Sequence, residues 1–257
     1  MSTEPASTKH RETLPSQLRI LHVYKSYYPD SVGGIEKTIY TISEELTSRA
    51  FDMTVLSLSA SPERGEYPVG SHRGYQARRD LYLFSTGLSL SFFGLFRRLA
   101  AQADIIHYHF PWPWMDLACL ASGRGKKSVC TYHSDIVRQR GLLLLYRPLM
   151  RLFLARMDRI VATSANYLAS SDVLKHYRSK TEIIPIGIDP TTFAGDKPED
   201  GGSRHDDLPP KFFVFIGVLR YYKGLHILID ALTGWDAPTV IIGAGPIERD
   251  LYDEPRI

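Results

Sequence analysis

The hydrophobic positions of the chain form short apolar runs that alternate with segments whose apolar residues recur at helical spacing. Runs rich in Ile, Leu, Val and Tyr predict strands. Ile35, Ile39, Ile42 and Leu46 share one face of a predicted helix. The predicted strands cover residues 19–28, 51–59, 75–84, 103–110, 126–135, 158–164 and 180–187. The predicted helices cover residues 34–50, 89–102, 115–123, 142–156 and 165–177, and a loop is predicted at 61–74. Uninterrupted alternation of this kind predicts a doubly wound α/β domain with right-handed crossovers.

A polar stretch then divides the chain. Residues 191–210 are charged, contain Gly and Pro, and predict a linker. Alternation restarts with strands at 211–219 and 238–245, separated by a helix at 223–232, and a further helix begins at Pro246. We therefore expect a disordered tail at 1–17, a complete Rossmann-like domain at 18–190 and the incomplete start of a second at 211–257. So short a second unit has too little apolar surface to fold alone, which favours a fragment of a longer protein.

Composition narrows the class of protein. With 44% hydrophobic and 23% charged residues, the chain is typical of a soluble globular protein. A net charge of +3 is too small to indicate a nucleic-acid partner. The polar N-terminus lacks the apolar core of a signal peptide, and no apolar run reaches the roughly 18–20 residues of a membrane span, so we expect a cytoplasmic protein. Cys119 and Cys130 predict buried free thiols rather than a disulfide framework or a zinc site.

Ligands of open α/β sheets bind at the carboxyl ends of the strands, so residues that follow predicted strands are the candidates for a site. Gly33 and Gly34 lie between the first strand and the first helix. They indicate either a phosphate at the helix N-terminus or a turn that needs a positive φ. His133 ends a strand and precedes Asp135. It could donate a hydrogen bond or move a proton in the cleft, or it could be a structural histidine tied to a backbone carbonyl.

Two further motifs follow the strand "ADIIHYHF" or lie in it. His107 and His109 alternate with apolar residues, so we expect them on one face of the sheet, with His109 nearer the carboxyl end. A metal ion would need a third ligand, which the sequence does not identify. Trp112 and Trp114, in "FPWPWMD", suit either stacking on a sugar or acceptor, or a hydrophobic plug that closes the sheet.

The second unit repeats the pattern of a strand followed by a candidate anion site. Arg220 and Lys223, before a helix, indicate a diphosphate clamp or a pair of solvated charges. Gly243 and Gly245, in "GAGP", indicate a second corner for close approach of a phosphate, or an ordinary turn. Arginines also gather around the leucine-rich helix 142–156, which favours either a solvated basic face or contact with anionic lipid. They are Arg138, Arg140, Arg147, Arg151, Arg156 and Arg159.

Together these motifs resemble the family 4 glycosyltransferases of the two-domain GT-B type. The elements that carry the resemblance are "YYPDSVGGIEKTIYTISEEL", "IIHYHFPWPWMDLA", "TYHSDIVRQ", "IIPIGID", "FIGVLRYYKGLHILIDAL" and "IIGAGP". They occur in the family's order from about residue 19 to residue 250. The chain is most similar to bacterial members that build surface polysaccharides, often mannosyltransferases.

The resemblance implies a retaining transfer of a hexose from a nucleotide diphosphate sugar to a glycan or lipid-linked acceptor, with no cofactor and no obligatory metal ion. It implies that Gly33 and Gly34 border the diphosphate, that His133 contacts the donor sugar near the reacting centre, and that the basic pair holds the diphosphate. Gly243 and Gly245 are expected on the same donor side. His109, Trp112, Trp114 and Asp135 are expected to contact the sugar or the acceptor. The protein is expected in the cytoplasm, where a lipid-linked acceptor would allow a peripheral contact with the inner face of the membrane.

One departure from the family bears on activity. In the family, the pocket for base and ribose and a pair of glutamates lie later in the second domain, and this sequence ends at Ile257 before them. We therefore expect a truncated chain. Two alternatives stay open: a non-catalytic remnant that binds an acceptor or a membrane, and a nucleotide-sugar epimerase of the same two-domain architecture.

Overall fold

Two units divide the chain in the computed structural model: Met1–Asp189, the N-terminal unit, and Pro190–Ile257, the C-terminal unit. The structure describes residues 17–63, 65–83, 86–122, 125–136, 140–188, 210–232, 238–245 and 247. The predicted tail, apart from residue 17, and the predicted linker, apart from residue 210, lie outside these ranges.

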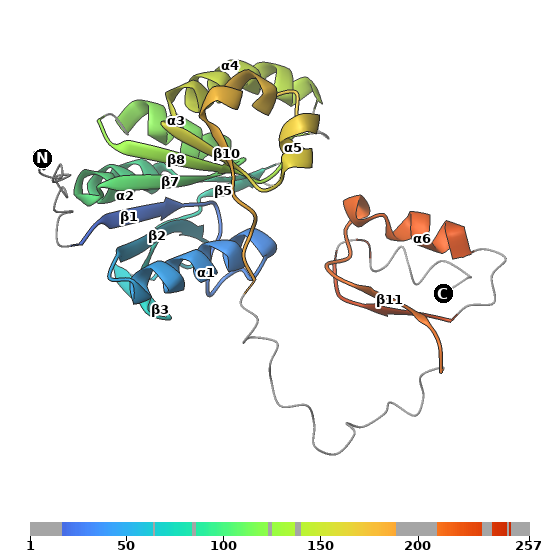
Figure 1. Cartoon of the computed structure of the whole chain (residues 1–257). Helices are drawn as coiled ribbons and strands as arrows, with labels where there is room; N and C mark the ends of the chain where they lie inside the picture. Colours follow the sequence, from blue (N-terminus) through green and yellow to red (C-terminus); the bar gives the residue numbers. More distant parts are fainter. Residues whose placement is uncertain are drawn as a thin grey trace, which may run out of the picture. The chain divides into compact units, whose positions relative to one another are not determined.

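A mostly parallel sheet forms the centre of the N-terminal unit (Figure 1). Its strands are β1 (Arg19–Val23), β2 (Asp52–Ser59), β3 (Glu66–Val69), β4 (His72–Arg78), β7 (Ile105–Phe110), β8 (Lys127–Tyr132), β9 (Arg159–Ala162) and β10 (Thr181–Ile183). They lie in the order β10-β9-β8-β7-β1-β2-β4-β3, and β3 alone pairs antiparallel. A separate hairpin joins β5 (Leu81–Leu83) to β6 (Thr86–Leu88). The first strand is therefore central and lies between β2 and β7.

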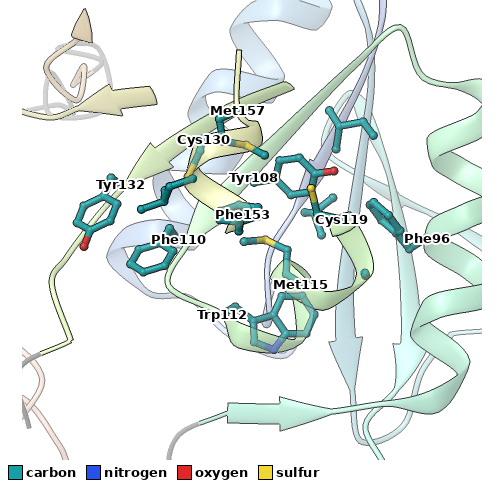
Figure 2. Packing of buried hydrophobic residues seen from close by; sticks show 14 of the residues in the cluster. Phe96, Tyr108, Phe110, Trp112, Met115, Cys119, Cys130, Tyr132, Phe153 and Met157 are labelled. Atoms are coloured by element: carbon teal, nitrogen blue, oxygen red, sulfur yellow. The ribbon is translucent and has the colours of Figure 1, made fainter. Parts of the chain in front are cut away.

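Helices cover both faces of this sheet. They are α1 (Gly34–Ser48), α2 (Leu90–Gln102), α3 (Pro113–Ser122), α4 (Arg140–Arg156), α5 (Ala165–Ser170) and a 3₁₀ helix at Leu174–Lys180. Side chains of α2, α3 and α4 pack on one face, in a core that includes Phe96, Met115 and Phe153 (Figure 2). On the other face, Ile39 of α1 packs with Val55 of β2. Burial of both faces explains the nearly continuous apolar strands.

Side-chain alternation divides each central strand between the two faces. Tyr108 and Phe110 of β7 join the core under α2, α3 and α4 (Figure 2). His107 and His109 alternate with them and lie together on the opposite face, which confirms the prediction that they share one face. Both cysteines are buried and free, as predicted.

The structure corrects three element predictions. Residues 61–74, predicted as a loop, contain β3 and the start of β4. The single strand predicted at 75–84 is interrupted between Arg78 and Leu81, where β4 ends and β5 begins. The helix predicted at 165–177 ends at Ser170, and the 3₁₀ helix follows it. Pro68 explains the first error, because proline lacks a donor and is tolerated in a strand at the edge of a sheet.

The C-terminal unit contains one β-α-β arrangement in its described part. Strand β11 (Phe213–Ile216) leads through a 3₁₀ turn (Tyr221–Lys223) into α6 (Leu225–Leu232), and β12 (Thr239–Ile242) pairs parallel with β11. Three of the four β11 side chains are exposed. The predicted helix after Pro246 lies outside the described residues, apart from residue 247.

Candidate functional site

Loops that follow β1, β7 and β8 meet at one edge of the N-terminal sheet, because these strands are parallel neighbours. The loop after β1 carries Gly33, the loop after β7 carries Trp112, and the loop after β8 carries His133 and Asp135. Residues from three distant parts of the sequence thus share the carboxyl edge, where α/β folds bind their ligands.

The glycine corner at the start of α1 holds a carboxylate of its own. Gly33 is the N-cap of α1, with φ −108° and ψ −178°, a conformation open to any residue. A Cβ at this position would overlap Oε2 of Glu36, whereas a Cβ on Gly34 would meet nothing within 4 Å. Glu36 is buried, and its Oε1 accepts hydrogen bonds from Ser26 Oγ at 2.7 Å and Ser31 Oγ at 2.8 Å. Gly33 is therefore needed for space, not for a positive φ.

This arrangement bears on the predicted phosphate site. The carboxylate of Glu36 lies in the first turn of α1, where the helix dipole favours a negative charge. The N-terminus of α1 thus already has an anion beside it, supplied by the chain. That Gly33 and Gly34 border a donor diphosphate stays a prediction, and the structure explains Gly33 without a ligand.

The two glycines make a matched pair for mutation. We expect Gly33→Ala to lower the free energy of unfolding by about 1–3 kcal/mol, because Glu36 must leave its two hydroxyl partners. Gly34→Ala, in open space within the helix, is expected to raise it by about 0.5–1 kcal/mol. Urea unfolding measures both. Equal effects of the two substitutions would contradict the packing argument, and Gly33→Ala in a Glu36→Ala background should cost much less.

Three histidines form a hydrogen-bonded chain, here called the histidine chain: His22 of β1, His109 of β7 and His133 after β8. Nδ1 of His22 lies 2.8 Å from Nε2 of His109, and Nδ1 of His109 lies 3.0 Å from Nε2 of His133. Consecutive rings meet at only 25° and 20°, with centroids 5.1 and 5.3 Å apart, so they join edge to edge. The histidine chain runs from the interior of the sheet to the loop that follows β8.

Burial keeps these imidazoles neutral. It lowers the pKa of His22 and of His109 well below the usual value, and neighbouring histidines lower them further. It lowers the pKa of His107 to about 3 and that of His133 to about 4, although the charge of Glu36 acts in the opposite direction on His133. A neutral His133 can donate or accept one hydrogen bond at each ring nitrogen, as the position of its proton dictates.

The structure supplies the third imidazole that the sequence left unidentified. Ring nitrogens of His22, His107 and His109 all lie within 4.8 Å of one another. Their orientation, however, differs from that of metal ligands. The His107 and His109 rings stack at 22° with centroids 4.5 Å apart, so their edges run parallel and do not converge. Nε2 of His109 already shares a hydrogen with His22, and Nε2 of His107 lies 2.7 Å from Thr131 Oγ1. Hydrogen bonding explains the cluster better than a metal ion does.

The tryptophan loop is a plug in the core more than an exposed platform. Trp112 is fully buried in the core (Figure 2). It packs against Phe92 and donates from Nε1 to the Gly87 carbonyl at 3.0 Å. The prediction of a stacking surface is therefore wrong for Trp112. Trp114 is half-buried and donates from Nε1 to the Ser89 carbonyl at 2.7 Å. Both indoles tie the loop after β7 to the segment that precedes α2.

Asp135 joins two elements beside the histidine chain. Its Oδ1 accepts hydrogen bonds from Tyr132 Oη at 2.8 Å and Ser171 Oγ at 2.9 Å. These bonds connect the end of β8 to the segment after α5. The structure thus gives Asp135 a positioning role, and its predicted contact with sugar or acceptor stays a prediction.

In the C-terminal unit, the predicted clamp residues lie on the surface. Arg220 is the N-cap of the 3₁₀ turn and Lys223 ends it; both are exposed, and Gly224 follows in the left-handed region with φ 72°. Gly243 and Gly245 have a structural reason of their own. A Cβ on Gly243 would overlap the Gly217 carbonyl, and a Cβ on Gly245 would overlap backbone of Leu219.

Sequence reasoning missed His22 and Glu36. His22 is one polar residue within an apolar strand, and its importance depends on the register of β1 with β7, which sets His22 opposite His107. A usable signal was present: the first strand of a doubly wound sheet is central, so polar side chains on its inner positions meet those of the next parallel neighbour. Glu36 stood three residues after Gly33, at the N3 position where acidic side chains turn back toward the helix start.

Comparison with solved structures defines the class of the fold. Sucrose-phosphate synthase from Thermosynechococcus elongatus matches 88% of this chain and 62% of its own, with a TM-score of 0.63 and 16% identity. Anabaena Alr3699/HepE in complex with UDP and glucose matches 92% of this chain and 64% of its own, with a TM-score of 0.58 and 17% identity. The chain has the α/β fold of the GT-B glycosyltransferases.

Sequence comparison then gives the family. The pattern of Glycosyltransferase Family 4 matches residues 32–192, and the chain belongs to this family. D-rhamnosyltransferase WbpZ of Pseudomonas aeruginosa is 53% identical over 237 residues, which are 91% of this chain and 62% of WbpZ. O-antigen chain mannosyltransferase C of Escherichia coli is 42% identical over 237 residues, 92% of this chain and 64% of the relative. The chain thus spans less than two thirds of the length of these relatives.

Proposed function

We propose that the protein transfers a hexose, such as mannose or rhamnose, from a nucleotide diphosphate sugar to a glycan or lipid-linked acceptor in surface polysaccharide synthesis. The observation that carries this proposal is the 53% identity to a D-rhamnosyltransferase over 91% of the chain. The second relative is a mannosyltransferase of an O-antigen chain, and a neighbour of the same fold was solved with UDP and glucose.

Charge development during the reaction assigns roles to the residues. As the glycosidic bond to the diphosphate breaks, negative charge grows on the leaving group, and fixed cations that meet it lower the barrier. In this proposal Arg220 and Lys223 are those cations, and Gly243 and Gly245 lie on the same donor side. His133 contacts the donor sugar, and Asp135 holds the loop that carries it. Retention of the anomeric configuration belongs to the proposal, and proton NMR of the product's anomeric position tests it.

A donor screen tests the activity. A full-length form of the protein is incubated with GDP-, UDP- and dTDP-linked mannose, rhamnose and glucose, with and without a glycan acceptor, and nucleotide release is recorded. We expect release that depends on acceptor with one preferred donor. Isomerised donor in the absence of acceptor would indicate an epimerase instead. Absence of both release and donor binding by calorimetry would favour a non-catalytic remnant.

We also propose a peripheral contact of α4 with the inner face of the membrane. Its exposed side carries Leu144, Leu145 and Leu152, which are 69%, 80% and 61% exposed, beside the exposed Arg147 and Arg151. Apolar side chains among arginines suit the headgroup region of anionic lipid. Arg138 and the side chain of Arg140 lie outside the described residues. Among the described residues, no helix is long and apolar enough to cross a membrane.

Vesicle binding tests this surface. We expect the protein to co-sediment with vesicles that contain anionic phospholipid, more weakly as salt rises. Leu144→Asp with Leu145→Asp should reduce binding at least about 5-fold, since apolar area is lost and negative charge is added beside the arginines. Leu90→Asp is the matched control, because Leu90 is 78% exposed on another helix. Equal binding to neutral vesicles, or an equal loss in the control, would exclude the α4 surface.

A further inference from the structure

One buried atom of the histidine chain has no hydrogen-bond partner among the described residues. Nε2 of His22 is buried, and none of the described residues forms a hydrogen bond with it. Four of the other five nitrogens form the two hydrogen bonds of the histidine chain: His22 Nδ1, both nitrogens of His109 and His133 Nε2. Nδ1 of His133, at the opposite end, is free of hydrogen bonds to the part of the protein that the structure describes. The proton positions of the three rings are therefore coupled, and the unpartnered end bears on which arrangement is stable.

Three neutral rings in this geometry have two consistent proton arrangements. In the first, His22 donates from Nδ1 to His109, His109 donates from Nδ1 to His133, and His133 carries its hydrogen on Nδ1. In the second, both bonds reverse: His133 donates from Nε2, His109 donates from Nε2, and His22 carries its hydrogen on the unpartnered Nε2. Each ring holds one hydrogen in either case, so no other arrangement preserves both bonds.

The two arrangements differ in what they leave unpaired in the interior. The first leaves a bare nitrogen of His22 without a donor. The second leaves a buried N–H without an acceptor, and orphaned buried N–H groups are the rarer and more costly kind. The same two hydrogen bonds form in both, and Nδ1 of His133, at the other end, is not among the fully buried unpartnered atoms, so solvent can accept its hydrogen. The first arrangement is therefore the favoured one.

We propose that His22 and His109 are positioning residues that hold His133 with its hydrogen on Nδ1, so that His133 meets its ligand as a neutral hydrogen-bond donor and not as a base. None of the described residues forms a hydrogen bond with His133 Nδ1. That nitrogen would donate to an oxygen, such as a hydroxyl of the donor sugar. The identity of this ligand rests on the proposed function, whereas the proton position does not.

Three observations support the coupling. Burial of the rings and their low pKa values keep them neutral, which the argument requires. The ring of His107 lies against both other rings: it is tilted by 35° to His22 and stacked on His109, with centroids 4.7 and 4.5 Å away. The backbone N–H of His133 donates to the Phe110 carbonyl at 3.2 Å, which holds the loop that carries the last ring of the histidine chain.

NMR of the chain labelled with ¹⁵N histidine tests the proposal directly. The ¹⁵N shift of a ring nitrogen differs strongly between its protonated and bare forms. We expect protonated Nδ1 in His22, His109 and His133, with ¹⁵N–¹⁵N couplings across both hydrogen bonds. A hydrogen on Nε2 of His133, or absence of these couplings, would overturn the proposal. So would loss of the couplings on addition of one equivalent of Zn²⁺, which would show a metal site instead.

Matched variants separate positioning from folding. His22→Leu removes the first donor, and we expect His133 to become a mixture of both tautomers and turnover to fall at least about 10-fold. His22→Asn keeps a donor nitrogen near the Nδ1 position and should restore both the single His133 tautomer and the turnover. His107→Phe keeps the stacked ring outside the chain and should leave the His133 tautomer unchanged. An unchanged tautomer in a folded His22→Leu would refute the coupling; if that variant does not fold, the wild-type spectrum still decides.

The spectra and the activity assay can fail independently. The expected tautomer in a protein that transfers no sugar would leave the coupling intact and refute the proposed function. An active protein whose His133 carries its hydrogen on Nε2 would refute the coupling and leave the proposed function intact.

Discussion

Replacing Arg220 and Lys223 together with alanine is expected to reduce turnover at least about 10³-fold in a full-length form of the protein. The two cations are exposed at the turn that precedes α6. If they meet the diphosphate, their charge matters most in the transition state, where the leaving group gains negative charge. Loss of a single such group typically costs about 10²–10³ in rate, and loss of a charged pair costs more.

The same assay distinguishes binding from catalysis. A fall in kcat shows that the pair acts in the transition state, whereas a rise in KM alone shows equal binding of substrate and transition state. Lys211→Ala is the matched control, since Lys211 is an exposed cation before β11 in the same unit. Unchanged turnover in the double variant would refute the diphosphate clamp. Arg220 and Lys223 would then be solvated surface charges.

Acidification is expected to unfold the N-terminal unit between about pH 6 and pH 4. His22, His107, His109 and His133 all have a pKa lowered by burial. Below about pH 6.5 these imidazoles therefore bind protons in the unfolded chain but not in the folded chain. The free energy of unfolding consequently falls as pH falls. Each imidazole contributes up to about 1.4 kcal/mol per pH unit. Four such groups together contribute up to about 5–6 kcal/mol per pH unit, so a typical stability of about 5–15 kcal/mol is lost within roughly one to three pH units.

One buried carboxyl acts in the opposite direction. Asp116 accepts a hydrogen bond from Tyr146, and burial raises its pKa well above the usual value. The folded state therefore holds this proton more tightly than the unfolded state, and the contribution of Asp116 to stability is lost as pH rises. It offsets about one of the four imidazoles, so the net dependence still has the sign set by the histidines.

Urea unfolding at a series of pH values, followed by far-UV circular dichroism, measures this dependence. His107→Phe should reduce the slope of stability against pH by about one proton, because it removes one buried imidazole and keeps the stacked ring. His176→Ala is the control, since His176 is exposed in the 3₁₀ helix. A stability that stays level from pH 7 to pH 4 would contradict the buried neutral state of the cluster.

Apolar periodicity predicted most of the fold because most of the elements are buried. The run "ADIIHYHF" and the spacing of Ile35 and Ile39 correspond to β7 and α1. Prediction failed at the edge, where β3 has only every second residue buried and contains Pro68. It also failed for Trp112, because sequence shows that an aromatic follows a strand but not whether a neighbouring segment covers it.

The sequence predicted where the residues of the candidate site lie in the fold, but not which side chains they contact. Placement after a strand identified His133 and Gly33 correctly as residues of the carboxyl edge. What holds each residue there was not readable, because the contacts join segments far apart in the chain. The His22–His109 bond spans 87 residues. The Glu36 carboxylate lies only three residues from Gly33, yet its direction depends on Ser26 and Ser31.

The order of the sheet also has a consequence for the timing of synthesis. The central strand β1 is made well before its neighbour β7, since His22 precedes its partner His109 by 87 residues. A ribosome that adds about 5–20 residues per second needs roughly 4 to 17 s to span that interval. Throughout that time, one edge of β1 and the imidazole of His22 lack their native partners. The newly made chain is then open to pairing with the wrong strand, and it is during those seconds that a chaperone would protect it.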